Sequence, residues 1–363
     1  MKIYNLPRQQ FSLSLSHIPE NEILNKVLYD KINSKKKEID SVRFKWDSAK
    51  KISNDYEYIY TSSNTHRNVS SIIPVSRSFF KLREIIYDYH LDTSGIIGCI
   101  AEAPGGFIQS IVKHKDEYSI KTEKIHGITL VSDDKDVPYW NPNLVKHPIV
   151  NICNGRDGTG DLYKLENVLE FIHSCGKSQC RLVTADGGFD YTSNFEQELS
   201  SYKLFYSEIM IAINTQIKGG TFICKLFDLF YISSIQLVFL LYLSYEHVSF
   251  IKPYTSRQSN SEKYIVCRGF KGYQKDISNL LCSYFGKTIL PIELPKEFIT
   301  MIDDYHTKFI SNQMNRIDGT LRIITKRLVL EKPSYQQIKL AKEWCQLYKI
   351  PINRSCIYLN RTR

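Results

Sequence analysis

The chain has 363 residues, which is long enough to bury a full-sized core without covalent cross-links. Its composition, 42% hydrophobic and 24% charged, is typical of a globular protein and excludes a disordered or fibrous chain. The 48 Lys and Arg residues outnumber the 38 Asp and Glu residues and give a formal net charge of +10, so a polyanionic partner is plausible, although a lysine-rich solvated surface gives the same balance.

The nine cysteines form no CxxC pair, which favours buried, reduced thiols and an intracellular protein. His173, Cys175 and Cys180 lie close in sequence, but no second ligand pair follows at zinc spacing, so we expect no metal site. The N-terminus lacks the apolar core of a signal peptide. The most apolar stretch, 229–243, is short for a bilayer and contains serines, so it predicts a buried helix and no membrane association.

Residues 1–70 are polar, carry a basic run at 35–37 and contain one predicted helix at 22–32. We expect them to form an N-terminal extension that could contact RNA. From residue 76 a helical segment passes through 79–82, and an apolar run at 96–100 then leads into Pro104-Gly105-Gly106. An apolar run, a glycine-rich turn and a second apolar stretch are typical of the strand, loop and helix that open an α/β nucleotide-binding fold.

Apolar runs and helix-length segments alternate through the middle of the chain. Strands are predicted at 125–131, 181–185, 221–224, 247–251 and 264–267, and helices at 162–174, 196–216 and 229–245. This alternation predicts an α/β, Rossmann-like domain over 71–285, with a mostly parallel central sheet covered by helices on both faces. After residue 286 the pattern indicates helices at 295–309 and 335–347, so we expect a C-terminal helical extension over 286–363.

The turn after the first predicted strand of this domain reads Glu102-Ala103-Pro104-Gly105-Gly106-Phe107. Two glycines after a strand allow the backbone to approach a ligand, although a plain tight turn has the same composition. The spacings GxGxxG and GxxxxGK[ST] are both missing here, which argues against dinucleotides and nucleoside triphosphates.

Three charged residues mark other strand ends. Asp186 ends the predicted strand at 181–185, Lys225 ends the one at 221–224, and Glu262 precedes the one at 264–267. Ligands of an open α/β sheet bind at the carboxyl ends of its strands, and a lysine within an apolar strand is costly unless it is paired. Each residue alone could belong to a surface ion pair. Their order around the glycine turn favours a shared site.

Between residues 54 and 350 the chain resembles the FtsJ-like family of 2′-O-ribose methyltransferases, and within it the branch specific for the messenger RNA cap. The resemblance rests on five segments: Ser76-Arg77-Ser78-Phe79-Phe80-Lys81-Leu82, Ala103-Pro104-Gly105-Gly106-Phe107, Leu182-Val183-Thr184-Ala185-Asp186-Gly187-Gly188-Phe189-Asp190, Gly219-Gly220-Thr221-Phe222-Ile223-Cys224-Lys225-Leu226-Phe227-Asp228-Leu229-Phe230, and Lys252-Pro253-Tyr254-Thr255-Ser256-Arg257 continuing through Asn260-Ser261-Glu262 to Cys267. It implies a class I methyltransferase fold with S-adenosylmethionine as cofactor.

The resemblance also implies that Lys81, Asp186, Lys225 and Glu262 form a catalytic tetrad. Methyl transfer to a ribose requires alignment of the 2′-oxygen and removal of its proton, and Lys225 is the candidate for that removal. Lys81 and the cofactor sulfonium would lower the pKa of Lys225, while Asp186 and Glu262 would raise it.

Cofactor contacts implied by the resemblance involve the glycine turn and two acids of a second loop. These residues are Glu102, Ala103, Pro104, Gly105, Gly106, Phe107, Asp157, Asp161 and Asp186. One departure stands out, since many family members place Asp five positions before the proline, where this chain has Cys99. Glu102 could supply the missing carboxylate. For the loop at 157–161, an ordinary Gly-Asp turn is the alternative interpretation.

The implied substrate is the capped 5′ end of messenger RNA, methylated on its first transcribed nucleotide, with the capping or transcription machinery as a further partner. Candidate RNA contacts are Lys50, Lys51, Tyr56, Arg77, Lys252, Ser256 and Arg257. Methylation of the second nucleotide, methylation of ribosomal or transfer RNA, and a catalytically silent RNA-binding subunit remain alternatives. The expected location is the cytoplasm or nucleus, or a viral factory or virion if the source is a DNA virus.

Overall fold

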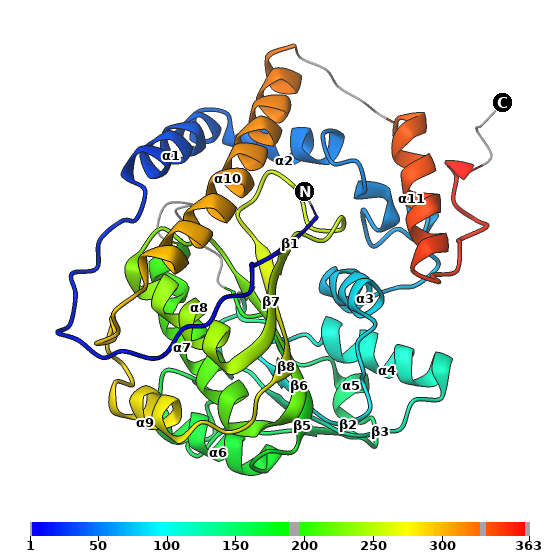
Figure 1. The fold of residues 1–363 in the computed structure, drawn as a ribbon. Coiled ribbons are helices and arrows are strands. Elements are labelled where there is room, and N and C mark those ends of the chain that lie inside the picture. Colours follow the sequence, from blue (N-terminus) through cyan, green and yellow to red (C-terminus); the bar gives the residue numbers. More distant parts are fainter. Residues whose placement is uncertain (1, 189–196, 327–331, 360–363) are drawn as a thin grey trace.

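The computed structural model describes residues 2–188, 197–326 and 332–359. Within them, one eight-stranded sheet forms the centre of the molecule, with strand order β1-β7-β8-β6-β5-β2-β3-β4 (Figure 1). Strands β4, β3, β2, β5 and β6 pair in parallel, whereas β8 is antiparallel to both β6 and β7, and β1 is antiparallel to β7. The predicted mostly parallel sheet is confirmed. The strands are β1 (Ile3–Asn5), β2 (Gly95–Ile100), β3 (Thr122–Ile128), β4 (Val150–Ile152), β5 (Cys180–Ala185), β6 (Gln216–Leu226), β7 (Tyr245–Ile251) and β8 (Lys263–Phe270).

Helices cover both faces of the sheet, as the alternation of elements predicts. One apolar cluster lies between the sheet and α3 and α4, and a larger one lies between the sheet and α6 to α10. The helices are α1 (Lys26–Asp40), α2 (Arg43–Ile52), α3 (Ser78–Tyr89), α4 (Gly106–Tyr118), α5 (Pro142–Val145), α6 (Leu165–Cys175), α7 (Gln197–Thr215), α8 (Ile232–Ser244), α9 (Lys275–Ser283), α10 (Lys296–Thr325) and α11 (Tyr335–Leu347), with 3₁₀ turns η1 (Glu57–Ile59) and η2 (Thr65–Arg67).

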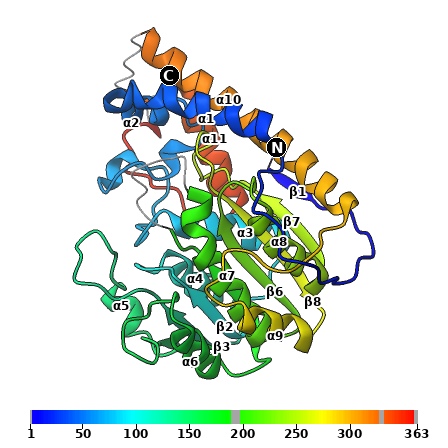
Figure 2. The ribbon, with the colours of Figure 1, turned by 90° about the vertical axis from the view of Figure 1, so that its left-hand side faces the viewer.

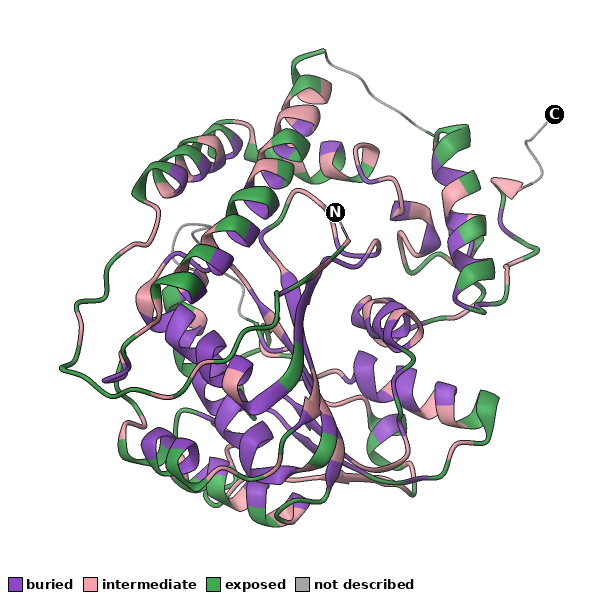
Figure 3. Ribbon diagram, viewed as in Figure 1, coloured by how far each residue is buried: buried purple, intermediate pink, exposed green. Residues whose placement is uncertain are grey.

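Most of the apolar stretch at 229–243 lies in α8, which begins at Ile232 and is buried along most of its length against the sheet (Figure 3). Its prediction as a buried helix is confirmed. No helix within the described residues combines the length and the apolar character that a bilayer crossing requires.

The helix predicted at 22–32 is misplaced. It begins at Lys26, because the side chain of Asn25 accepts a hydrogen bond from the backbone N–H of Leu28 and so caps the helix, and it runs on to Asp40. The helix predicted at 295–309 likewise continues to Thr325 in α10. Glu196, the predicted start of the helix now seen as α7, lies outside the described residues.

The N- and C-terminal segments pack onto the central domain. β1 extends the sheet beside β7, α10 packs against α1 and α2, and α11 packs against η1 (Figures 1 and 2). Leu28 and Ile32 of α1 share an apolar cluster with Phe298 and Ile302 of α10 and with the helices behind the sheet. The division of the chain into three parts at residues 70 and 285 stays a prediction. The main apolar cluster contains residues from all three parts.

Candidate active site

Four charged side chains converge at one edge of the sheet. Asp186 directly follows β5 and Lys225 lies near the end of β6, where parallel strands bring their carboxyl ends together. Glu262 precedes β8, and because β8 runs antiparallel to β6, its start lies at the same edge. Lys81 comes from the first turns of α3. The side chains are 11–14% exposed, so solvent can reach each of them only in part.

The four side chains form two lysine–carboxylate pairs. Lys81 Nζ lies 2.8 Å from each carboxylate oxygen of Glu262. Lys225 Nζ donates to the backbone carbonyl of Asp186 at 2.9 Å and lies 3.5 Å from Asp186 Oδ1. Opposite charges in a partly buried site fix one another's positions more firmly than surface pairs do.

Two residues that were expected to contact RNA instead hold Glu262 and its loop in place. Ser256 Oγ donates to Glu262 Oε1 at 2.7 Å, and Lys252 Nζ donates to the carbonyl oxygens of Asn260, at 2.9 Å, and of Glu262. Both side chains are buried, and burial lowers the pKa of Lys252 to about 7. Their contacts are therefore with the loop that carries Glu262, and a direct contact with RNA would require them to leave it.

Neighbouring cations keep Glu262 ionised. Burial alone would raise the pKa of Glu262, but Lys81, Lys225 and Lys252 outweigh it and hold that pKa well below its usual range. A carboxylate that stays charged is a firm anchor for the Lys81 ammonium.

Asp186 has a further partner in Tyr264, whose hydroxyl donates to Asp186 Oδ1 at 2.7 Å. Tyr264 pairs with Lys225 in the register of β6 and β8, and its ring is fully buried. The sequence did not single out Tyr264, because an aromatic residue in an apolar strand looks like ordinary core.

The glycine turn at 105–106 is shaped by close contacts. Gly105 has φ 109°, a conformation that favours glycine, at the start of α4. A Cβ atom at Gly106 would lie 2.1 Å from Ser78 Oγ and 2.3 Å from Ser76 Oγ. Only glycine fits there, so the turn packs directly on the N-terminus of the helix that carries Lys81.

Glu102 fits the carboxylate role implied for it. It is 3% exposed, and its carboxylate oxygens have no cationic partner among the described residues, with only the hydroxyl of Thr184 and the thiol of Cys99 close enough to lower its pKa. Burial raises its pKa well above the usual range. A buried carboxyl group without a cationic partner is costly. A cationic group of a ligand, such as the α-ammonium of S-adenosylmethionine, would satisfy it. Cys99 lies buried in β2, in contact with Thr184.

Asp157 and Asp161 shape their own loop. The Asp157 carboxylate pairs with Lys164 and accepts from Thr159 N, at 3.0 Å, and Asn167 Nδ2, at 3.0 Å. The bond from Lys164 contributes most to a strongly lowered pKa of Asp157. Asp161 Oδ1 accepts from Tyr163 N at 2.9 Å. Because these contacts join the loop to itself and to the start of α6, the carboxylates order the backbone around the predicted adenosine site.

Asn167, which the sequence did not single out, supports this loop from α6. Its fully buried side chain accepts from Arg156 N at 2.7 Å and Asp157 N at 3.2 Å, and donates to Asp161 O at 3.0 Å. An amide can satisfy donors and acceptors together, which a carboxylate cannot do.

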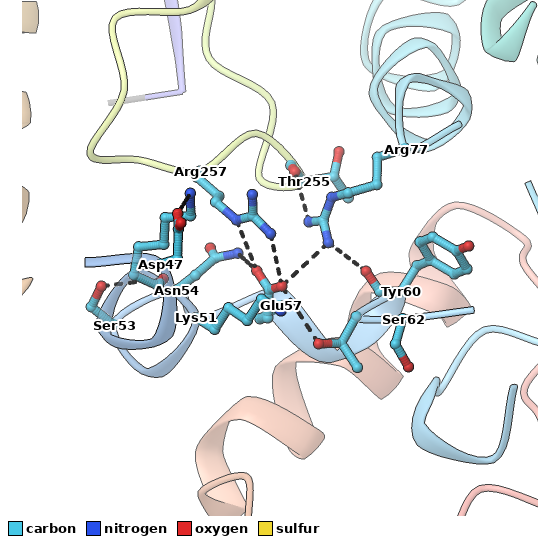
Figure 4. A network of polar contacts seen from close by, with 12 residues as sticks. Asp47, Lys51, Ser53, Asn54, Glu57, Tyr60, Ser62, Arg77, Thr255 and Arg257 are labelled. Atoms are coloured by element: carbon cyan, nitrogen blue, oxygen red, sulfur yellow. Dashed lines mark hydrogen bonds and ion pairs between the residues drawn. The ribbon is translucent and has the colours of Figure 1, made fainter. Parts of the chain in front are cut away.

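Arg77 and Arg257 meet at the buried carboxylate of Glu57 (Figure 4). Arg257 Nη2 lies 3.1 Å and Arg77 Nη1 3.5 Å from Glu57 Oε1, and Asn54 donates to Oε2 at 2.7 Å. Burial would raise the pKa of Glu57, but the two arginines lower it. Glu57 thus fixes two arginines whose side chains remain 25% and 27% exposed. A lone Glu in a polar segment gave no sequence signal for this role.

A cavity of about 360 Å³ opens between α1, α2, α10 and the loop that leads to Glu262. Lys50 lines it, whereas Lys51 does not, and the ring of Tyr56 instead stacks on Tyr254 with centroids 4.6 Å apart. The lining residues are Lys36, Ile39, Asp40, Arg43, Trp46, Asp47, Lys50, Gln197, Arg257, Ser259, Asn260, Ser261 and Gln313.

Phe189 and Asp190, part of the segment that suggested the acidic strand end, lie outside the described residues. No group of three or more His, Cys, Asp or Glu side chains suited to a metal ion occurs within the described ranges.

Comparison with known proteins finds a family match that includes Lys81, Asp186, Lys225 and Glu262. The FtsJ-like methyltransferase family model matches residues 74–270. A protein of Trypanosoma brucei brucei named cap-specific mRNA (nucleoside-2′-O-)-methyltransferase 1 is 31% identical over 255 residues, which cover 66% of this chain and 66% of that protein. The mouse protein of the same name is 29% identical over 274 residues, covering 69% and 32%.

A Drosophila melanogaster protein named cap-specific mRNA (nucleoside-2′-O-)-methyltransferase 2 is 26% identical over 308 residues, covering 76% of this chain and 43% of that protein. The matched region thus spans between about a third and two thirds of the length of these relatives.

Proposed function

Because the chain belongs to the FtsJ-like methyltransferase family, we propose that it methylates the ribose 2′-hydroxyl of the first transcribed nucleotide of capped messenger RNA, with S-adenosylmethionine as methyl donor. The observation that carries the proposal is the meeting of Lys81, Asp186, Lys225 and Glu262 at the sheet edge, beside the turn at 105–106.

The residues divide the work of the reaction. S-adenosylmethionine supplies an electrophilic methyl group on a sulfonium sulfur. Lys225 takes or polarises the hydroxyl proton, Asp186 fixes the Lys225 ammonium, and Glu262 fixes Lys81. Glu102, whose buried carboxylate has no cationic partner among the described residues, would hold the methionine ammonium. The loop at 157–161, held by Asn167, would face the adenosine.

The cavity beside Glu262 suits a cap guanine. Its lining includes the aromatic ring of Trp46 and the carboxylate of Asp47, and an N7-methylated guanine is a flat cation that can stack on one and pair with the other. Arg257 lines the same cavity, and Arg77 shares the Glu57 carboxylate with it, so both are placed to meet the phosphates that join a cap to the first nucleotide.

The relatives named as cap-specific methyltransferases support this substrate. Ser261 lines the cavity and is adjacent to Glu262, and this closeness favours the first nucleotide over later ones. A protein with this function would work wherever messenger RNA is capped, in the nucleus or the cytoplasm, beside the capping or transcription machinery.

Substitution of Lys225 tests the proposal. We expect Lys225→Ala to abolish methyl transfer to capped RNA while the dissociation constant for S-adenosylmethionine, measured by calorimetry, changes less than about threefold. Lys287→Ala, on a lysine that lies away from the tetrad, serves as the control and should retain full transfer. Undiminished transfer by Lys225→Ala would remove Lys225 from the mechanism.

A further inference from the structure

A buried carboxyl group that the proposed mechanism does not use lies behind Lys225. Glu208 sits in α7 between Ser207 and Ile209, within a stretch of the helix that is buried throughout, and is itself 2% exposed. An acidic side chain at such a position needs either a hydrogen-bonding or an electrostatic partner.

The contacts of Glu208 point toward the catalytic strand end. Its Oε2 accepts from the thiol of Cys224 at 3.0 Å, and Cys224 precedes Lys225 in β6. Its Oε1 has no hydrogen-bond partner within the described part of the chain. A Cβ atom at Gly187 would lie 2.9 Å from Oε1, so the carboxyl group lies directly against the turn that follows Asp186.

Lys225 approaches the same turn. A Cβ atom at Gly188 would lie 2.7 Å from Lys225 Nζ. Glu208 and Lys225 also line one cavity of about 20 Å³, together with polar side chains of Glu198, Ser201, Asp228 and Ser234. Apolar side chains complete the lining, and a cavity of that size with several polar groups on its wall is large enough for a single water molecule.

The charged and titratable groups that act on Glu208 come from several elements. Burial raises the pKa of Glu208 to about 8, the thiol of Cys224 and the charge of Lys225 oppose that rise, and Asp186 adds to it. Glu102, after β2, is a further acid near enough to interact. Lys225 is the cation among these groups, so the charge of Glu208 affects the protonation of Lys225 most directly.

We propose that Glu208 is a positioning residue for Lys225, whose ammonium form its carboxylate stabilises, directly or through one water, when Lys225 accepts the hydroxyl proton. This inference rests on the proposed function, because the proton comes from the ribose hydroxyl. In that step the O–H bond breaks, the amine of Lys225 becomes an ammonium, and Glu208 supplies the compensating negative charge.

The direct test measures the pKa of the Lys225 amine by NMR titration of protein that contains ¹³C-labelled lysine. The Lys225 signal is assigned by its loss in Lys225→Arg. Above its pKa of about 8 Glu208 is ionised, so Glu208→Gln removes a nearby negative charge there, and we expect the pKa of Lys225 to fall by about one unit. With capped RNA, the acid limb of kcat should move to lower pH, and the plateau should drop several-fold because a weaker base transfers the proton more slowly.

Glu198→Gln is the matched control. Glu198 is also a buried carboxyl of α7 lining the same cavity, but its oxygens accept from the backbone N–H groups of Phe230 and Tyr231, both at 2.9 Å. We expect Glu198→Gln to lower the thermal unfolding temperature and to leave the pKa of Lys225 within a few tenths of a unit of its wild-type value.

If Glu208→Gln does not fold, Cys224→Ala gives a second route. Loss of the thiol donor raises the pKa of Glu208 further, so the pKa of Lys225 should again fall, by a smaller amount. An unchanged pKa of Lys225 in the folded variants would overturn the inference. A wild-type protein that methylates no RNA would instead overturn the proposed function, and with it the role in the reaction, whatever the NMR titration shows.

Discussion

Asn167 shows how one side chain can order a whole ligand loop. It bonds to three backbone groups of the loop at 155–161 from a fully buried position. The loop also approaches Asn167 closely, since a Cβ atom at Gly155 would lie 2.4 Å from Asn167 Oδ1. The loop conformation therefore depends on an amide at this position.

We expect Asn167→Ala to weaken S-adenosylmethionine binding about tenfold, as the loss of buried hydrogen bonds leaves backbone donors unpaired. At saturating cofactor, kcat should change little, because Asn167 does not touch the tetrad. Calorimetric dissociation constants test this, with Asn312→Ala on the exposed face of α10 as control. Equal affinities for wild type and Asn167→Ala would show that the loop does not contact the cofactor.

At the scale of elements, α1 is joined to the catalytic strand end through a buried ion pair. Lys36 Nζ lies 2.9 Å from Asp228 Oδ2, and Lys263 lies 3.8 Å from Oδ1. Burial opposes ionisation of Asp228, but these lysines outweigh it and lower its pKa to about 2. The N-terminal extension thus contacts the segment that follows Lys225.

Lys36→Met should destabilise the protein by about 3 kcal/mol, because it leaves a buried carboxylate short of its nearest partner. Lys35→Met removes a neighbouring lysine that is 24% exposed and should cost less than about 1 kcal/mol. Chemical denaturation of both variants measures the difference. A cost for Lys36→Met no larger than that for Lys35→Met would contradict the role of the buried pair.

The same pair predicts a pH dependence. The pKa of Asp228 is about 2 in the folded protein and lies below its unfolded value, so its contribution to stability is complete above the unfolded value and is lost as pH falls through about 2. In Lys36→Met, the fall in unfolding free energy over this acid range should be smaller than in wild type.

Most elements of the fold could be predicted from the sequence, because strand and helix periods alternate clearly between 96 and 270. The bounds were less predictable. α10 runs to Thr325 because its apolar face continues along α1 and α2, a tertiary contact that no local pattern encodes. The four tetrad residues could be named through the resemblance, and the structure brings them together.

The supporting residues could not be predicted. Tyr264, Glu208 and Asn167 contact partners that lie 78, 16 and 11 positions away in the sequence. Their roles appear only once β5, β6, β8 and α6 are assembled. Glu208 did leave a signal, as an acid within the mostly apolar stretch from Leu204 to Ile213 of α7. Lys252 and Ser256 looked like surface contacts because sequence does not report burial.

At the scale of the molecule, the C-terminal helices complete the core. The ring of Tyr305 in α10 stacks on Phe250 of β7 with centroids 4.0 Å apart, and Trp344 of α11 contacts Phe80 of α3. Phe298, Tyr305 and Ile310 are almost fully buried, and exposing each would cost about 2 kcal/mol.

We therefore expect a chain ending at residue 285 to be unstable or insoluble, although it retains the whole tetrad. Cooperative thermal unfolding of that truncated chain within a few degrees of the full chain would show that the extension at 286–363 is an independent addition. Soluble expression and calorimetry distinguish the two results.

The central claim is that this protein modifies the ribose of the first nucleotide of capped RNA. The most direct test is transfer of labelled methyl from S-adenosylmethionine to matched RNAs with an N7-methylated cap, an unmethylated cap or no cap, followed by mapping of the modified ribose. We predict label on the first nucleotide of capped RNA, with none on uncapped RNA. Label on the second nucleotide, on internal positions or on uncapped RNA, or no label at all, would contradict the account.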